Sequence, residues 1–140
     1  MKNIVEKSTI IKYRRERAYE TLDHVKQLVD LNMLAFAMNR IYYAGFYIVN
    51  ALMVIDNKKF TKHKQVIGYF NKEYLKTNII NRGIGKILND SFERRTALDY
   101  HDYTTVTNSE VKEYLAEMKK FVSEVDNLIE EKLKPNKTPK

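Results

Sequence analysis

The chain has 140 residues, enough for one domain with its own hydrophobic core. Its 25 basic and 18 acidic side chains give a net charge of +7, which favours RNA, DNA, a nucleotide or an acidic protein as partner. A soluble surface that is merely rich in lysine explains the same charge equally well. The absence of cysteine excludes disulfides, thiolate catalysis and cysteine-based zinc sites, and it fits a cytoplasmic protein, which we expect this to be.

The N-terminal half predicts two long helices. Apolar residues recur at intervals of three, four and seven over residues 10–31, which is the period of an amphipathic helix. The polar residues at 30–32 predict the turn that follows. Residues 33–55 form a second, largely apolar segment that is long enough to span a membrane. Because it contains Asn39, Arg40 and Asn50, we interpret it as a buried helix and expect no membrane span.

Three further helices are predicted in the second half. A short helix follows Thr61, and a fourth runs from residue 79 or 80 toward Leu98, with an uncertain start because Gly83 and Gly85 weaken its first turns. Thr107 and Glu110 have the spacing of a capping box, in which the threonine hydroxyl and the glutamate carboxylate satisfy free amides at a helix start. The apolar stripe that begins at Val111 fits either a coiled-coil seam or, as we expect from its width, a helix packed within a bundle.

These elements predict an all-α fold, an antiparallel up-and-down bundle of four to five helices. We expect residues 1–134 to form a single domain and residues 135–140, which include both prolines of the chain, to form a disordered tail. The three histidines, His24, His63 and His101, lack the spacing of metal ligands, so we expect no metal and no cofactor.

The most distinctive stretch chemically is residues 92–103, where two arginines, a histidine and two tyrosines lie at the end of the fourth predicted helix. Arginine offers a fork of donors that suits phosphate oxygens, and histidine exchanges a proton near neutral pH, so the pair fits phosphate-ester chemistry. Arg94 and His101 are seven residues apart and share a helical face. Arg95 and His101 lie about 120° apart around a helix, so they meet only if the helix ends or bends between them. The alternative is a solvated, charged helix end.

Four stretches occur in a shared order and spacing: MNRIYYAGF at 38–46, TKH at 61–63, GKILN at 85–89 and RTALDY at 95–100. Together they resemble the HEPN family of small helical domains from prokaryotes, over residues 10–133. The resemblance implies an up-and-down helical bundle that is usually a homodimer. It also implies a partner, because such domains are often encoded beside a minimal nucleotidyltransferase of the MNT type as a toxin–antitoxin pair.

Active members of this family cut RNA without a metal and carry an arginine, four to six residues, and a histidine. Arg95 and His101 fit that spacing, and so does Arg94 with His101. The resemblance therefore implies that His101 moves a proton while Arg95, with Arg94 as alternative or helper, binds the phosphate. Asp99 and Tyr100 would orient these groups or close the helix. Related domains often keep the equivalents of Arg95, Asp99 and Tyr100 without the histidine, so a non-catalytic module that docks the nucleotidyltransferase or binds nucleotides is the alternative, followed by a purely structural dimer.

Two further predictions concern single residues. In some relatives a tyrosine two positions beyond the histidine is adenylylated by the partner, and Tyr103 has that place; the alternative is an ordinary exposed loop tyrosine. Lys62, His63 and Lys64 lie in a basic loop, where they are either plain surface residues or contacts to an RNA backbone.

Overall fold

The computed structural model describes residues 2–100 and 105–135. The prediction of an all-α fold is confirmed, because the described residues form helices and no strand. The helices are α1 (Lys2–Asp30), α2 (Leu34–Ile55), α3 (His63–Phe70), the π-helical turn η1 (Asn71–Leu75), α4 (Arg82–Tyr100) and α5 (Asn108–Leu133). Residues 136–140 of the predicted tail lie outside the described residues.

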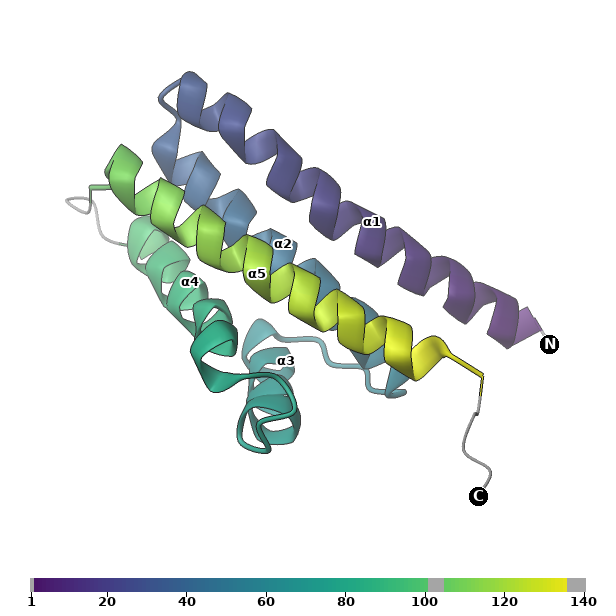
Figure 1. Cartoon of the computed structure of the whole chain (residues 1–140). Coiled ribbons are helices and arrows are strands. Elements are labelled where there is room, and N and C mark those ends of the chain that lie inside the picture. The colour runs from purple at the N-terminus through teal and green to yellow at the C-terminus, as the bar shows by residue number, and fades with distance from the viewer. Residues whose placement is uncertain (1, 101–104, 136–140) are drawn as a thin grey trace.

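The four long helices run alternately up and down (Figure 1). The helices α1 and α2 form a hairpin, α4 and α5 form a second one, and the short α3 packs near the start of α4. Figure 1 also places the N-terminus of α1 and the C-terminus of α5 at the same end of the bundle. None of the helices within the described residues has the length and apolarity required to cross a membrane.

The largely apolar α2 lies at the centre of the bundle, as its sequence predicted. It packs against α1, α4 and α5, and its buried residues lie on nearly all sides of the helix. The apolar stripe of α5 faces the same core, which favours the bundle over a coiled-coil seam. Full burial of such an aliphatic or aromatic side chain contributes about 1.5–3 kcal/mol to stability. Side chains from three helices that are completely buried include Tyr42, Ile48, Leu88, Phe121 and Ile129.

Asparagines in the left-handed region end three of the helical segments. Asn32 (φ 59°), Asn57 (φ 58°) and Asn78 (φ 59°) adopt a conformation that most side chains avoid and asparagine tolerates. At the first of these turns the amide of Met33 donates to the carbonyl of Leu28 at 2.8 Å, which satisfies one of the last carbonyls of α1. The turn predicted at residues 30–32 is therefore confirmed as a helix end.

The start of α4 lies at Arg82, two to three residues later than we predicted. Asn81 explains the shift, because its side-chain oxygen accepts a hydrogen bond from the amide of Ile84 at 3.1 Å, as an N-cap does. Gly85 is required by close approach: a Cβ atom at this position would lie 2.1 Å from Cδ2 of Leu75. The turn η1, which supplies Leu75, was not predicted from the sequence.

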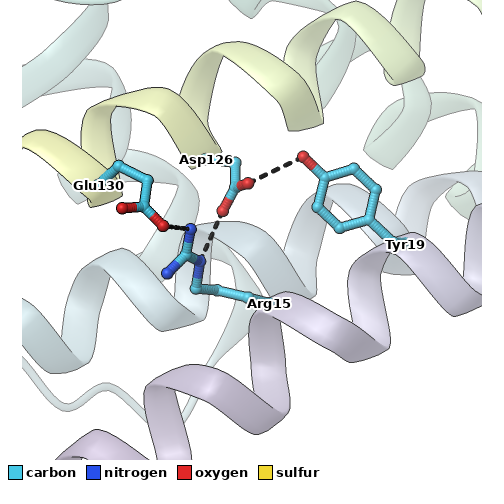
Figure 2. A network of polar contacts seen from close by, with 4 residues as sticks. All are labelled: Arg15, Tyr19, Asp126 and Glu130. Atoms are coloured by element: carbon cyan, nitrogen blue, oxygen red, sulfur yellow. Dashed lines mark hydrogen bonds and ion pairs between the residues drawn. The ribbon is translucent and has the colours of Figure 1, made fainter.

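A polar network joins α1 to α5 (Figure 2). The guanidinium of Arg15 donates to Asp126 at 2.6 Å and to Glu130 at 2.5 Å, and the hydroxyl of Tyr19 donates to the other oxygen of Asp126 at 2.9 Å. Burial, followed by the bond to Asp126, raises the pKa of Tyr19 to about 12. Asp126 therefore accepts bonds from two residues of α1 and fixes the register of the two helices.

Candidate functional site

Arg95 extends from α4 toward two tyrosine rings of α2. Its guanidinium carbon lies 5.3 Å from the ring centroid of Tyr43 and 5.6 Å from that of Tyr42. At these distances a cation is attracted to the ring face by about 0.5–2 kcal/mol. The side chain is only 24% exposed, so Arg95 is held by α2 rather than spread on the surface of α4.

The guanidinium of Arg95 retains an unused donor. Its Nε atom is buried and makes no hydrogen bond to any residue that the structure describes. The nearest carboxylate, that of Asp99 one turn later on α4, is 3.4 Å away and forms an ion pair without hydrogen-bond geometry. A buried donor without a partner costs about 1–3 kcal/mol, so a rotation of the side chain that brings Nε to a ligand oxygen would recover that energy.

Arg95 lines a cavity of about 280 Å³ between α4 and the first turns of α2. The other lining residues are Ala35, Phe36, Asn39, Leu98 and Asp99. One side of the cavity is therefore apolar, and the other carries a cation beside an amide and a carboxylate. Asn39 is already engaged, since its side-chain oxygen accepts two hydrogen bonds from Arg40, at 3.0 and 3.2 Å. Among the described residues that line the cavity, Arg95 is the one that carries a positive charge.

His63 belongs to the same cluster of side chains. Its ring stacks on Phe46 with a centroid distance of 4.0 Å, and its Nδ1 atom is 2.6 Å from the hydroxyl of Tyr42. The sequence suggested an exposed residue of a basic loop, but His63 is half-buried at the first position of α3 and folds inward against α2. Its neighbours Lys62 and Lys64 are exposed, but Lys64 lies in α3 rather than in the predicted basic loop, which ends at Lys62.

Burial sets the protonation of this pair. It raises the pKa of Tyr42, so the phenol keeps its proton, and the hydroxyl shares a hydrogen bond with Nδ1 of His63. The pKa of His63 is lowered by burial and then by the charge of Arg95. His63 is therefore neutral at physiological pH. His63 belongs to the stretch TKH and Arg95 to the stretch RTALDY, both of which carry the family resemblance, but neither stretch indicated that the two side chains lie close together.

Arg94 is directed to a different surface from Arg95. Its guanidinium binds both oxygens of Glu110, one of them at 2.9 Å, and donates to the carbonyl of Thr105 at 2.6 Å. The hydrogen bond from Arg94 is the main cause of the lowered pKa of Glu110. Thr107 caps the same helix as predicted, because its Oγ1 accepts from the amide of Glu110 at 3.1 Å. Arg94 thus fastens α4 to α5, and it is not among the residues lining the Arg95 cavity.

The remaining predicted residues divide into three groups. Asp99 lies beside Arg95, as an orienting role requires, whereas Tyr100 at the end of α4 is 78% exposed. His101 and Tyr103 lie outside the described residues, so their roles stay predictions. Lys64 lines a separate cavity of about 540 Å³ together with Asn71 and Asn89, whose amides exchange hydrogen bonds at 2.9 and 3.0 Å.

Residues 2–100 and 105–135 contain no group of three or more His, Asp or Glu side chains placed to hold a metal ion. The site that the structure brings together consists of a guanidinium, a neighbouring carboxylate, two phenols and a neutral imidazole. Of these groups, Arg95 and Asp99 were predicted from the sequence, while Tyr42, Tyr43 and His63 were not assigned to the site.

Comparison with known proteins identifies the family of the chain. The family model described as "HEPN domain" matches residues 11–128. A UPF0332 protein of Thermotoga maritima is 40% identical over 126 residues, which cover 90% of this chain and 96% of the relative. A protein of Methanocaldococcus jannaschii that bears the name "Putative toxin MJ0142" is 32% identical over 111 residues, or 75% of each chain. The match to the family model takes in all of α2, α3 and α4, which supply the site. The chain therefore belongs to the HEPN domain family.

Proposed function

We propose that the protein is a metal-independent endoribonuclease and acts as the toxin of a toxin–antitoxin pair. The observation that carries the proposal is the guanidinium of Arg95, which lines a cavity and keeps a buried Nε donor without a hydrogen bond among the described residues. A phosphate oxygen is an acceptor of the right charge for that donor. The toxin assignment draws on the name of the archaeal relative, which is a property of that protein.

The proposed reaction is a transesterification within RNA. The 2′-hydroxyl of one nucleotide attacks the adjacent phosphorus, the bond to the 5′-oxygen breaks, and a 2′,3′-cyclic phosphate and a free 5′-hydroxyl result. His101 acts as general base or acid on these two oxygens, which contributes on the order of 10²–10⁴ in rate. Arg95 binds the phosphate and offsets the negative charge that grows in the transition state. Asp99 orients Arg95 through the ion pair described above.

A homodimer would complete this site. Each chain contributes one histidine at this point of the sequence, whereas the reaction needs an acid and a base. The exposed apolar residues at the start of α2 support such an interface: Leu31, Met33 and Phe36 are 68%, 40% and 62% exposed, and Phe36 also lines the Arg95 cavity. Replacing Phe36 by glutamate should yield a monomer in analytical ultracentrifugation; a wild-type chain that sediments as a monomer at micromolar concentration would contradict the dimer.

The decisive experiment is an RNA cleavage assay in EDTA. The wild type should cut RNA to products with 2′,3′-cyclic phosphate ends, and Arg95→Ala or His101→Ala should abolish cutting while circular dichroism shows an intact helical fold. Cleavage that survives in both variants would remove the assignment of the site.

The same exposed surface favours a second function, a non-catalytic module that docks a minimal nucleotidyltransferase. In that case the purified chain does not cut RNA but binds the nucleotidyltransferase encoded beside it, and Phe36→Glu weakens the complex. Tyr103 is then the proposed acceptor of AMP. Incubation with that enzyme and ATP should add whole AMP masses to the wild type and none to Tyr103→Phe.

A further inference from the structure

Arginines and tyrosines alternate along the seam between α1 and α2 and continue to the Arg95 site. The guanidinium of Arg17 on α1 lies 4.9 Å from the ring centroid of Tyr47 on α2, and it donates to the hydroxyl of Tyr13 at 2.7 Å. The rings of Tyr47 and Tyr43 are 5.9 Å apart, and Tyr43 in turn lies 5.3 Å from Arg95. An unbroken series of ring and guanidinium contacts therefore joins α4 to the outer side of α1.

The seam leads at its other end to a basic cavity of about 430 Å³, formed by α1, the end of α2 and the loop that follows it. Phe60 supplies an aromatic wall, and no acidic residue is among the described residues that line the space. Arg14 connects the cavity to the seam, since its guanidinium is 3.4 Å from the carbonyl of Asn50. The cationic residues that line the cavity are Lys7, Arg14, Lys58 and Lys59.

The carboxylate nearest in the sequence to Lys58 and Lys59 is already engaged elsewhere. Asp56 precedes the basic loop but does not line the cavity. It accepts hydrogen bonds from Tyr69 at 3.1 Å and from Tyr74, and it pairs with Lys132 on α5 at 3.2 Å. The positive charge of the cavity is therefore not offset by Asp56, and a cationic concavity of this kind attracts phosphate groups.

We propose that the α1–α2 seam holds a single strand of RNA, which runs from the Arg95 cavity past Tyr43 and Tyr47 to the basic cavity. This inference rests on the proposed function, because it takes the strand bound by Arg95 to be the substrate. Along α2 the distance from Tyr43 to Val54 at the cavity is about 16 Å, from eleven residues at 1.5 Å each. The two helices that form the seam lie side by side over this length (Figure 1).

The chemistry of the seam fits an unpaired strand. Aromatic faces stack on bases that are free of a partner strand, and cations between them contact the phosphates. Tyr13 is 55% exposed, and Tyr43 and Tyr47 are half-buried, so their rings retain surface for a base. Contacts of this type do not distinguish one base from another, so binding along the seam is tolerant of sequence.

Binding is measured by fluorescence anisotropy in EDTA with a short, labelled 2′-O-methyl oligouridylate. This probe lacks the attacking hydroxyl, so binding is separated from cleavage. The triple variant Lys7→Ala, Lys58→Ala, Lys59→Ala should bind roughly tenfold more weakly. The slope of log affinity against log salt should shrink by about 2, because each lost phosphate contact on a single strand removes about 0.7. The matched control replaces Lys112, Lys119 and Lys120, exposed lysines of α5, and should bind as the wild type does.

The aromatic part of the seam has a separate signature. Tyr47→Ala should weaken binding roughly 5- to 150-fold with an unchanged salt slope, whereas Tyr47→Phe, which keeps the ring, should bind as the wild type. Thermal melting of each variant verifies that it is folded.

Equal losses of affinity in the seam triple and the control triple would overturn the inference, because net charge alone would then explain binding. Binding of an RNA duplex as tight as that of the single strand would overturn it too. Seam-dependent binding by a protein that does not cut RNA supports the inference while the proposed function fails. Conversely, if the variant with Lys7, Lys58 and Lys59 replaced cuts RNA with the KM of the wild type, the inference is overturned and the proposed function stands.

Discussion

The hydroxyl of Tyr42 and Nδ1 of His63 form a hydrogen bond of 2.6 Å beside the guanidinium of Arg95, and burial together with the charge of Arg95 lowers the pKa of this imidazole. The bond joins α2 to the first residue of α3. Protonation of His63 is disfavoured at this position, since the imidazolium would be half-buried beside the positive charge of Arg95.

The first prediction concerns stability at mildly acidic pH. Because the pKa of His63 is lowered in the folded chain from its ordinary value near 6.5, the unfolded chain binds more protons as the pH falls below that value. The contribution of His63 is therefore fully present above about pH 6.5 and is lost as the pH falls toward the folded pKa. Urea unfolding from pH 7 to pH 5 should show a smaller loss of stability in His63→Gln than in the wild type. His24→Gln, a change at an exposed residue of α1, is the control; parallel curves for the wild type and His63→Gln would refute the assignment.

The second prediction separates the two adjacent arginines. Arg94→Ala removes the bonds to Glu110 and Thr105 and should lower the free energy of unfolding by about 1.5–3 kcal/mol, while any RNA cleavage by the folded protein persists. Arg95→Ala should have the reverse pattern, with a small change in stability and loss of cleavage. Denaturant titration and the EDTA cleavage assay, run on both variants, decide the matter; loss of cleavage in folded Arg94→Ala would assign Arg94 a chemical role.

The third prediction uses two glycines in helices. Gly85→Ala should destabilise the protein by about 1–3 kcal/mol, because the added Cβ would lie 2.1 Å from Leu75 and overpack the contact between α4 and η1. A Cβ atom added at Gly68 in α3 would meet nothing within 4 Å, so Gly68→Ala should instead stabilise the chain by about 0.5–1 kcal/mol through helix propensity. Opposite shifts of the melting temperature are expected, and a stabilised Gly85→Ala would show that Leu75 moves aside freely.

The fourth prediction concerns the network that joins α1 and α5. Asp126→Asn should lower the free energy of unfolding by about 1.5–3 kcal/mol, because it weakens the hydrogen bonds from Arg15 and Tyr19 to a carboxylate that is only 18% exposed. Glu130 is 59% exposed, so Glu130→Gln should cost no more than about 1 kcal/mol. The double variant Asp126→Asn, Tyr19→Phe should lose less free energy of unfolding than the two single variants added together, since both changes act on the same hydrogen bond. Strict additivity in urea unfolding would contradict the shared acceptor.

Local patterns predicted the helices well because each residue's preference agrees with the final fold. The apolar composition of residues 33–55 predicted a buried α2, the period of the apolar residues identified the buried face of α5, and the polar residues at 30–32 marked a turn that the structure contains. The cap at Thr107 was also predicted, and the hydroxyl makes the expected bond.

The parts that failed depend on contacts between distant residues. Periodicity does not reveal that Arg94 forms an ion pair with Glu110, sixteen residues away. It also does not reveal that His63 packs inward against Phe46 and Tyr42. The π-helical turn at Asn71–Leu75 likewise packs against a distant residue, Gly85, through Leu75, and local sequence patterns do not predict this contact. At the site, the arginine motif identified Arg95 and Asp99. The phenols and the imidazole lie in two other stretches that carry the resemblance, but nothing in those stretches showed that they meet Arg95.

The opposite directions of Arg94 and Arg95 make this part of α4 sensitive to changes in length. Successive side chains on an α-helix are rotated by about 100°, so the two residues reach α5 and α2 respectively because of a single step along the chain. Deleting one residue from the preceding turn would rotate both arginines together, withdrawing one from Glu110 and the other from the tyrosines. Insertions and deletions are therefore far less tolerable in this turn than substitutions, and natural variation in chain length should be confined to the connections between helices.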